Sequence, residues 1–565
     1  MLVLAIVFSF AACGGSKDNG DSASEMVLNV GAYPDTIDPA LNSAVDGATY
    51  IIHNFVGLIG YDVNGDLVPM CAAEIPEVVA TEDGKYSYTF TLRDGLKWND
   101  GTDLDANDFV YSWNRAADPA TAADYSYMFD VIDGYGTDKL NITASEDGKQ
   151  LTVVLSANVP YFMELCAFPT YMPVKQEVVE ANGDAWATKA ETYIGNGPYK
   201  VTGFTQAELT LEKNEHYWDA DSVVTDKIIF AFNDDDTSLL ANYQNGAYLF
   251  IDSVPQDEIE NLSTNYPNEY FVEGQLGTYY VSFNMNDPAL AAFTEEERVS
   301  IRTALSLMIE RNYVCTDIGK AGQVPANGFV AMGLTEPDGK QFIEKNGVNR
   351  DGSGYFSVDP ADYAANCAEA VKLLESVAAS SGKFTVKDGA AVGFPTLTYI
   401  TNEGTGHEAV AAYLQETWSQ YGITVKVETQ EWATFLNTRK NGEYSVARNG
   451  WLGDYNDPIS FLDMWITESG NNDSQFGKDA HATYAGYDGK TWAESYDVII
   501  AKVKASSDPE ERFELMHQAE DILMSTGAIC PVYYYTDIYM CSEKIDGFFS
   551  SPLGYKFFMY ASIAE

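Results

Sequence analysis

The chain has 565 residues, enough for three or four structural units, and its 46% hydrophobic and 13% aromatic content excludes a disordered or fibrous protein. Its 84 acidic residues against 33 lysines and arginines give a formal charge of −51, which argues against nucleic acid as a partner. A cationic ligand would be attracted, although solubility in an exposed compartment also explains the charge.

An uncharged apolar segment opens the chain and ends in small residues before Cys13. It is shorter than the ~20 residues of a spanning helix and fits a secretory signal, so we expect a signal peptide at 1–12. The basic leader of such signals is not present, for which an upstream start codon is one explanation. The run Phe-Ala-Ala-Cys resembles a bacterial lipobox, which implies that Cys13 is lipidated. Residues 13–25 are rich in Gly, Ser and acidic residues and predict a flexible tether.

Strand-like segments alternate with amphipathic helices along the chain, which predicts an α/β or mixed α+β organisation. Thr294 and Glu297 have the spacing of a capping box and predict a helix that continues through Met308. Strong helix-to-strand punctuation near 191–203 leaves open that the chain crosses between domains more than once.

Three further elements are predicted in the last third of the chain. Thr405 and Glu408 again have capping-box spacing, and the helix that they open should stop at Gly422, followed by a strand with alternating apolar residues at 423–427. A helix should begin at 508–509 and end at Gly527, before a strand around Tyr533, Tyr534 and Tyr535 that returns to a sheet.

Cysteine spacing excludes the common metal and redox motifs. Besides Cys13 there are six cysteines, at 71, 166, 315, 367, 530 and 541, and no two of them form a C-x-x-C pair, so neither a zinc site nor a thioredoxin-type site is supported. Cys530 and Cys541 flank the β-prone run around residue 534. A disulfide between them is one alternative, and buried free thiols are the other.

Sequence signatures of catalysis and of cofactor binding are missing. There is no G-x-S-x-G elbow, P-loop, H-E-x-x-H pair or dinucleotide fingerprint, so we expect no catalytic residue, no cofactor and no metal site. Residues 62–66 have glycine at the wrong position for an EF-hand and predict a plain turn. The run Asn-Asp-Asp-Asp at 233–236 predicts a solvated acidic loop, with calcium binding as the alternative.

Three stretches, taken together, resemble one family, the extracellular solute-binding proteins of the peptide and nickel class. They are LRDGLKWNDG (92–101) with ANDFVYSWNR (106–115); GNGPY (195–199) with LEKN (211–214) and Tyr217-Trp218; and Glu431-Trp432, Phe435-Leu436 and VARNGWLGDYNDP (446–458). The likeness runs from about residue 26 to the C-terminus.

The resemblance implies an α/β, two-lobed, periplasmic-binding-protein-like fold with an extra subdomain in the first lobe. The expected segments are 26–58, 191–280 and 526–565 for lobe I, 59–190 for the extra subdomain and 281–525 for lobe II. Several relatives carry a cysteine that closes a disulfide where this chain has Leu452, so that bridge should be missing here. The cleft between the lobes would close over a ligand by a hinge motion.

The resemblance also implies the residues of a peptide site. Asp454 matches the carboxylate that pairs with the peptide α-ammonium, and such a charge-assisted contact contributes on the order of 1.5–3 kcal/mol. Arg448 and His407 match positions that meet the peptide carboxylate, and His407 stands two residues after Thr405 at a helix N-terminus, which also favours an anion. The remaining expected contacts are Trp451, Tyr279, Tyr280, Asn284, Tyr455 and Asn456.

The sequence thus predicts a monomeric lipoprotein on the outer face of a bacterial cell membrane that captures short peptides and delivers them to the permease subunits of an ABC importer. Relatives with this fold that carry cello-oligosaccharides, nickel chelates or haem supply one alternative. A secreted hydrolase using Asp454 and Asp457 as a carboxylate pair is another. A peptide-sensing role without transport stays open.

Overall fold

The computed structural model describes residues 24–478 and 490–564. The predicted signal peptide and Cys13 lie outside these ranges, and of the predicted tether only Ser24 and Glu25 are described. Glu25 already begins the first strand, β1. No helix in the described ranges is both long enough and apolar enough to cross a membrane.

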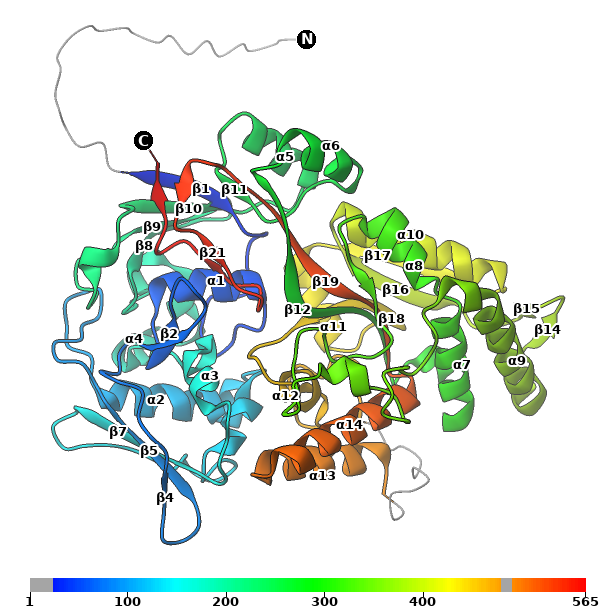
Figure 1. Ribbon diagram of the computed structural model, residues 1–565, viewed down its shortest axis with the longest axis horizontal. Helices are drawn as coiled ribbons and strands as arrows, with labels where there is room; N and C mark the ends of the chain where they lie inside the picture. Colours follow the sequence, from blue (N-terminus) through cyan, green and yellow to red (C-terminus); the bar gives the residue numbers. More distant parts are fainter. Residues whose placement is uncertain (1–23, 479–489, 565) are drawn as a thin grey trace, which may run out of the picture.

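One mixed sheet of eleven strands runs through the molecule (Figure 1). In spatial order its continuous path is β17 (Val425–Gln430), β16 (Leu397–Asn402), β18 (Val446–Leu452), β12 (Tyr270–Phe283), β19 (Ile529–Cys541), β11 (Phe250–Ile251), β1 (Glu25–Asn29), β10 (Lys227–Ala231), β9 (Glu208–Lys213) and β8 (Tyr199–Phe204), and β13 (Val324–Pro325) pairs with β19 beside this path. Parallel pairing occurs around β1 and around β16, as expected for α/β lobes with helical crossovers.

The two long strands β12 and β19 connect the halves of this sheet. The first half of β12 pairs only with β19, and its second half lies between β19 and β18, with a register shift between Gly274 and Thr278. Figure 1 shows the blue and cyan elements on one side of β12 and β19 and the yellow-green elements on the other. The two-lobed fold is therefore confirmed, with lobe I on the β11 to β8 side and lobe II on the β18 to β17 side; the predicted segment boundaries stay a prediction.

Lobe I carries a separate four-stranded sheet and most of the short elements. Its helices are α1 (Val45–Asn54), α2 (Ala106–Ala117), α3 (Phe162–Ala167), α4 (Gln176–Asn182), α5 (Asp236–Gln244) and α6 (Ile259–Asn265). Its additional strands are β4 (Val79–Ala80), β5 (Tyr86–Thr91), β7 (Gln150–Leu155) and β6 (Ile142–Ala144) in one sheet, and the pairs β2 (Ile59–Tyr61) with β3 (Leu67–Pro69), β20 (Ile545–Asp546) with β23 (Ser562–Ile563), and β21 (Phe549–Ser550) with β22 (Lys556–Phe557). Of the strand, turn and helix expected at 92–115, the turn lies at Gly95 and the helix is α2, whereas the strand β5 ends just before this stretch, at Thr91.

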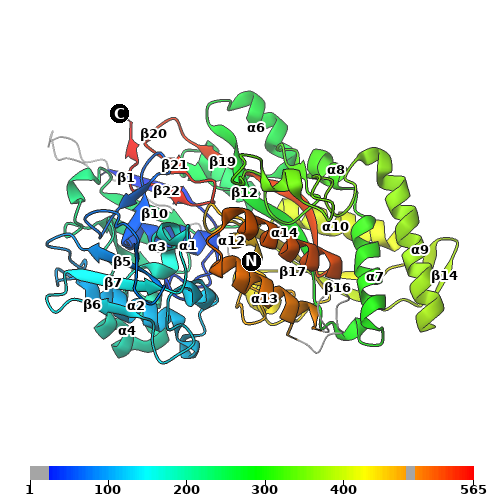
Figure 2. The same ribbon diagram turned by 60° about the horizontal axis from the view of Figure 1, so that its bottom comes forward.

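Lobe II contains the helices that the sequence predicts most clearly. They are α7 (Glu295–Leu307), α8 (Arg311–Tyr313), α9 (Tyr363–Ser381), α10 (Thr405–Gln420), α11 (Trp432–Lys440), α12 (Ile459–Leu462), α13 (Trp492–Ala505) and α14 (Pro509–Thr526), with a hairpin of β14 (Thr385–Lys387) and β15 (Ala390–Val392). The capping box at Thr294 and Glu297 is confirmed, as is the stop of α14 at Gly527, whose φ of 64° is the left-handed conformation that glycine favours. Helices α13 and α14 pack together near the boundary between the lobes (Figure 2).

The capping box predicted at Thr405 and Glu408 is wrong, although the helix itself is confirmed. Gly404 occupies the N-cap position of α10, and no side chain caps the helix. The Thr405 hydroxyl instead donates a hydrogen bond to the Asp236 carboxylate at 2.7 Å. The Thr405 hydroxyl therefore bonds to the other lobe and does not cap its own helix, contrary to the prediction from the local sequence.

The predicted strand around residue 534 is β19, and it shows why one disulfide alternative is wrong. Cys530 and Cys541 lie eleven positions apart in this single extended strand, which at ~3.3 Å per residue places them far beyond bonding distance. All six cysteines in the described ranges are buried free thiols. The alternative of free thiols is the one that the structure confirms.

The two acidic turns differ from each other. Residues 62–66 form the predicted plain turn between β2 and β3. The run 233–236 is only partly the solvated loop that was predicted, because Asp235 caps α5 while Asp236 is buried and accepts hydrogen bonds from Ser253 and Thr405. No group of three or more potential metal ligands occurs among the residues that the structure describes, so calcium binding gains no support.

Candidate functional site

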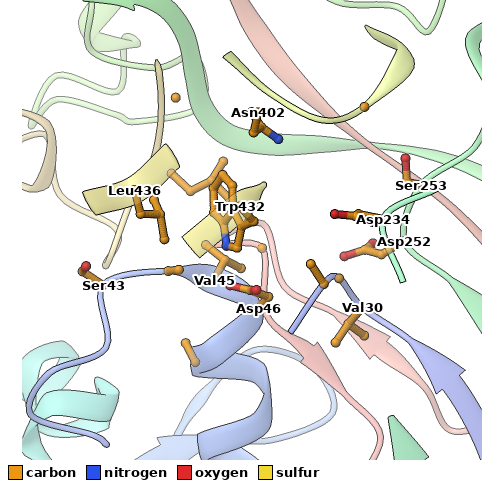
Figure 3. A pocket seen from close by; sticks show the side chains of 18 of the residues that line it. Val30, Ser43, Val45, Asp46, Asp234, Asp252, Ser253, Asn402, Trp432 and Leu436 are labelled. Carbon is orange, nitrogen blue, oxygen red and sulfur yellow. The ribbon is translucent and has the colours of Figure 1, made fainter. Parts of the chain in front are cut away.

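A cavity of about 410 Å³ lies between the lobes, within the roughly 300–1,000 Å³ typical of ligand pockets. Lobe I lines it with the connection from β1 to α1 and with the start of α5, and lobe II with β18, α11 and the start of α10. Figure 3 shows Val45 and Asp46 of lobe I facing Trp432 and Leu436 of α11. Four of the predicted site residues line this cavity: Asp454, Arg448, His407 and Trp451.

Asp454 is a buried carboxyl group without a cation. It follows β18 and is 7% exposed; Tyr125 donates a hydrogen bond to its Oδ1 at 2.9 Å, and the Ser460 hydroxyl lies 3.4 Å from its Oδ2. No lysine, arginine or histidine lies within ion-pair distance of it in the described ranges. Burial raises the pKa of Asp454 well above its ordinary range, the Tyr125 hydrogen bond lowers it in part, and the nearby Asp463 raises it further. A bound ammonium would satisfy this carboxylate.

The loop that presents Asp454 is held by a buried ion pair. Both oxygens of Asp457 accept hydrogen bonds from the Arg512 guanidinium of α14, each at 2.8 Å. Asp457 is 9% exposed and Arg512 is 4% exposed. The pair fixes residues 453–458 against α14 and uses both oxygens of Asp457.

Replacing Arg512 by methionine is expected to lower the free energy of unfolding by about 3 kcal/mol, because Asp457 would stay buried without its partner. Urea denaturation measures the loss. Adding Asp457→Asn to the same chain should recover part of it, since no unpaired charge then remains. A loss below about 0.5 kcal/mol in the single variant, the range of a surface substitution, would show that the pair does not stabilise the loop.

Arg448 is the complementary cation of the cavity. Its Nη2 lies 3.2 Å from Nε2 of His407, and its guanidinium lies 5.5 Å from the ring centre of Tyr279 and 6.0 Å from that of Trp432. It is 9% exposed, its Nε has no hydrogen-bond partner, and no carboxylate of the described chain lies within ion-pair distance. A bound carboxylate would satisfy this guanidinium.

His407 supports Arg448 as a neutral side chain. It lies at the N-terminus of α10, as predicted, where it is the third helical residue, and its ring stacks on Tyr279 with the centres 5.8 Å apart. Burial, and then the charge of Arg448, hold the pKa of His407 well below its ordinary value. Because a guanidinium only donates, Nε2 of His407 accepts the hydrogen bond from Arg448. His407 thus orients Arg448 toward the cavity.

Of the other predicted residues, one lines the cavity, one lies beneath the lining residues, and four lie away from the lining. Trp451 lines the cavity, and its indole donates a hydrogen bond to the Ser460 carbonyl at 2.8 Å. Tyr279 is fully buried beneath His407 and Arg448 and does not line the cavity. The remaining four are not brought to the lining: Tyr280 packs on Phe329 and Trp465, Asn284 donates to the Gly442 and Tyr444 carbonyls, Tyr455 stacks on Tyr161, and Asn456 is exposed.

Sequence reasoning missed a group of carboxylates that line the cavity from both lobes. We call this group the acidic wall: Asp46, Asp234, Asp236, Asp252 and Glu403. Burial raises the pKa of Asp46 to about 6 and that of Asp252 to about 7. Figure 3 shows Asp234 and Asp252 pointing into the cavity from lobe I. The run 233–236 was the only signal of this wall in the sequence, because the other members are far apart along the chain.

Several polar contacts join the lobes around the cavity. Lys440 of α11 forms an ion pair with Asp124 at 2.5 Å, and Lys504 of α13 forms one with Asp130 at 2.8 Å. The hydrogen bond from Tyr125 to Asp454 also crosses from one lobe to the other. The described arrangement therefore has its lobes in direct contact.

Comparison with known proteins by family model, by sequence and by structure finds bacterial solute-binding proteins each time. The model of the bacterial extracellular solute-binding proteins, family 5, matches residues 66–473. The periplasmic oligopeptide-binding protein OppA of Salmonella typhimurium is 31% identical over 539 residues, covering 93% of this chain and 89% of that protein. The structure of Haemophilus influenzae OppA in complex with the peptide RPPGFSPFR has a TM-score of 0.82 and 26% identity, covering 96% of this chain and all of that one.

Two structures of one relative distinguish the lobe arrangement. The murein tripeptide-binding protein MppA of Escherichia coli gives a TM-score of 0.80 at 27% identity, covering 96% of this chain and 99% of that chain. Its unliganded open form gives only 0.58 at 26% identity, with 96% and 98% covered. Because the two share nearly the same coverage, the difference reports how the lobes are placed. The lobes described here are not in the arrangement of that open form.

Proposed function

The chain belongs to family 5 of the bacterial extracellular solute-binding proteins, and from this premise we propose that it captures short peptides in the cavity between its lobes. The resemblance predicted from its sequence motifs is thereby confirmed at the level of the family. Peptide capture goes further, and it is supported by the chemistry of the cavity and by relatives whose names state that they bind oligopeptides.

One observation carries the proposal. Asp454 and Arg448 line the same cavity, are each more than nine-tenths buried, are an acid and a base, and lack a charged partner among the described residues. Burying an isolated charge is costly unless a partner compensates it. A free peptide carries an ammonium at one end and a carboxylate at the other, so it supplies both partners at once.

Binding without catalysis is part of the same proposal. Asp457, the second member of the carboxylate pair weighed for a hydrolase, has both oxygens bonded to Arg512 and does not line the cavity. The relatives are named as binding proteins. We therefore propose that the ligand leaves unchanged, and that the protein acts as a monomer.

The proposal includes anchoring and delivery. Lipidation at Cys13 would hold the protein at the outer face of the membrane through the tether of residues 13–25. Contacts between the lobes, such as that of Lys440 with Asp124, would stabilise a closed form that docks on the permease subunits of an ABC importer. Closure around the ligand and reopening at the importer then give one cycle of capture and release.

Native mass spectrometry of the protein as purified tests the ligand class. A series of adducts with the masses of short peptides supports the proposal. Adducts of cello-oligosaccharide, haem or nickel-chelate mass would contradict it, as would a peptide mixture that is cleaved on incubation. If the protein carries no adduct, calorimetry with trialanine decides: the absence of binding at millimolar peptide would overturn peptide capture.

Replacing Arg448 by methionine is expected to weaken trialanine binding about tenfold or more, because a charge-assisted contact with the peptide carboxylate is lost. Isothermal titration calorimetry measures the change. The C-terminally amidated peptide is the matched control, since it has no carboxylate to lose and should bind the variant and the parent protein alike. An equal loss for both peptides would show that Arg448 has only a structural role.

A further inference from the structure

The acidic wall contains more negative charge than the protein compensates. Asp46, Asp234 and Glu403 have no cation within ion-pair distance in the described part of the chain. Asp236 receives hydrogen bonds only from neutral groups, of Ser253 and of Thr405. Asp252 lies 3.3 Å from Lys556, and its Oδ1 is buried without a hydrogen bond. Four of the five wall carboxylates, all except Asp252, therefore have no ion-pair partner in the described part of the chain.

Three of the four described arginines and lysines that line the cavity form ion pairs with carboxylates outside the acidic wall. Arg439 pairs with Asp473 at 2.6 Å, and Lys440 pairs with Asp124. Lys556 is fully buried and lies closer to Asp537, at 2.6 Å, than to the wall. Only Arg448 lacks an ion-pair partner among the lining arginines and lysines of the described chain.

A count of charges shows what the ligand must supply. A peptide with neutral side chains satisfies Asp454 through its ammonium and Arg448 through its carboxylate. Asp46, Asp234, Asp236 and Glu403 would then still face the cavity without a cation. Closing the lobes over such a ligand leaves these carboxylates in a cavity with less water, which is unfavourable.

We infer that the acidic wall binds a cationic side chain of the peptide, so that the protein prefers peptides that contain lysine or arginine. This inference rests on the proposed function, because Asp454 and Arg448 hold the peptide ends and the wall selects the side chain. Figure 3 shows the wall residues Asp46, Asp234 and Asp252 around the space beside Trp432. The indole ring offers a surface for the aliphatic stem of such a side chain and for its charge.

The geometry favours an organic cation over a metal ion. The wall carboxylates come from four places in the chain: α1, the start of α5, the residue after β11 and the residue after β16. No cluster of metal ligands is formed among them or elsewhere in the described ranges. A lysine or arginine side chain can contact several carboxylates that lie apart, whereas a metal ion needs its ligands at ~2–2.6 Å.

Calorimetry with a matched set of tripeptides tests the inference. Trialanine is compared with the three peptides that carry one lysine, at the first, second or third position, and with the same three carrying norleucine. Norleucine has the aliphatic stem of lysine without its charge, so the ratio of the two affinities isolates the charge. We expect one lysine position to bind about tenfold or more tightly than its norleucine counterpart. Glutamate at that position should bind more weakly than norleucine.

Variants of the wall assign the preference to its carboxylates. Asp234→Asn, alone and with Asp46→Asn, should reduce the ratio of lysine to norleucine affinity toward one. Asp66→Asn is the matched control, because Asp66 is an exposed aspartate in the turn between β2 and β3, outside the cavity. Among the described residues the partly buried Asp234 side chain accepts no hydrogen bond, so its replacement should leave the fold intact, which a thermal melt verifies.

Three results would overturn the inference. If every lysine peptide binds like its norleucine counterpart while trialanine binds, the wall does not select cations, although peptide capture stands. If a preference exists but Asp234→Asn with Asp46→Asn leaves it intact, the wall is not its source. If no tripeptide binds, the proposed function fails and the inference fails with it.

Discussion

Replacing Asp454 by asparagine is expected to weaken the binding of trialanine about a hundredfold, which corresponds to ~3 kcal/mol. The variant keeps the shape of the side chain and its hydrogen bond from Tyr125, but a peptide ammonium would enter a buried site without a counter-charge. Isothermal titration calorimetry at neutral pH and moderate salt measures the ratio. Unchanged affinity would remove the central element of the peptide proposal.

Two controls separate a lost contact from a damaged fold. N-acetylated trialanine has no ammonium, so the parent protein and the variant should bind it with the same low affinity. In the ligand-free protein the buried Asp454 carboxylate lacks a cation, and burial raises its pKa. Asp454→Asn should therefore leave the melting temperature unchanged or raise it. A large fall in melting temperature would mean that the carboxylate supports the fold, and the affinity loss would then have another cause.

The fold could be predicted largely because local patterns dominate its helices. Helix α14 begins after Asp508 and ends at Gly527, and both positions are satisfied by local hydrogen bonds and backbone conformation. At the start of α10 the same reasoning failed, because the Thr405 hydroxyl bonds to Asp236 in the other lobe. A capping motif describes only neighbours in sequence, and a contact between lobes can outweigh it.

Sequence reasoning predicted three residues that line the cavity at its charged positions, Asp454, Arg448 and His407, and it predicted the residues around them only in part. Tyr279 and Tyr280 are adjacent in β12, and adjacent strand residues point to opposite faces, so only one of them could face His407 and Arg448. The acidic wall could not be predicted, because Asp46, Asp252 and Glu403 belong to segments that only the fold brings together.

The second prediction with a large expected effect is a release of protons when the peptide binds. Peptide binding is expected to release a proton from Asp454 wherever the pH lies below the raised pKa of its free carboxyl. The bound ammonium lowers that pKa toward or below the ordinary range. In the window between the two values, the free protein holds a proton that the complex lacks, so affinity should rise with pH, by up to about tenfold per pH unit.

Two other groups change the proton balance in the opposite direction, the peptide ammonium at high pH and His407 beside the peptide carboxylate. Above about pH 8 the peptide ammonium itself loses its proton, so affinity should fall again. A peptide carboxylate beside His407, whose pKa is held low by burial and by Arg448, would favour proton uptake there and oppose the release at Asp454. The net release measured for the parent protein is therefore a lower limit for Asp454.

Calorimetry in buffers of different ionisation enthalpy measures the proton balance directly, for trialanine between about pH 4.5 and about pH 8. Asp454→Asn removes the release but leaves His407 and the acidic wall in place, so the difference between the two proteins belongs to Asp454 alone.

The stability of the protein should depend on pH in a related way. Without peptide, the stabilising effect of the neutral Asp454 carboxyl is lost as the pH rises through its raised pKa, and bound peptide reverses that loss. The rise in melting temperature caused by trialanine should therefore grow with pH in the parent protein and stay flatter in the variant. Proton release that is identical in both proteins would mean that Asp454 is already ionised before the peptide arrives, and its burial would then be compensated by a group other than the ligand.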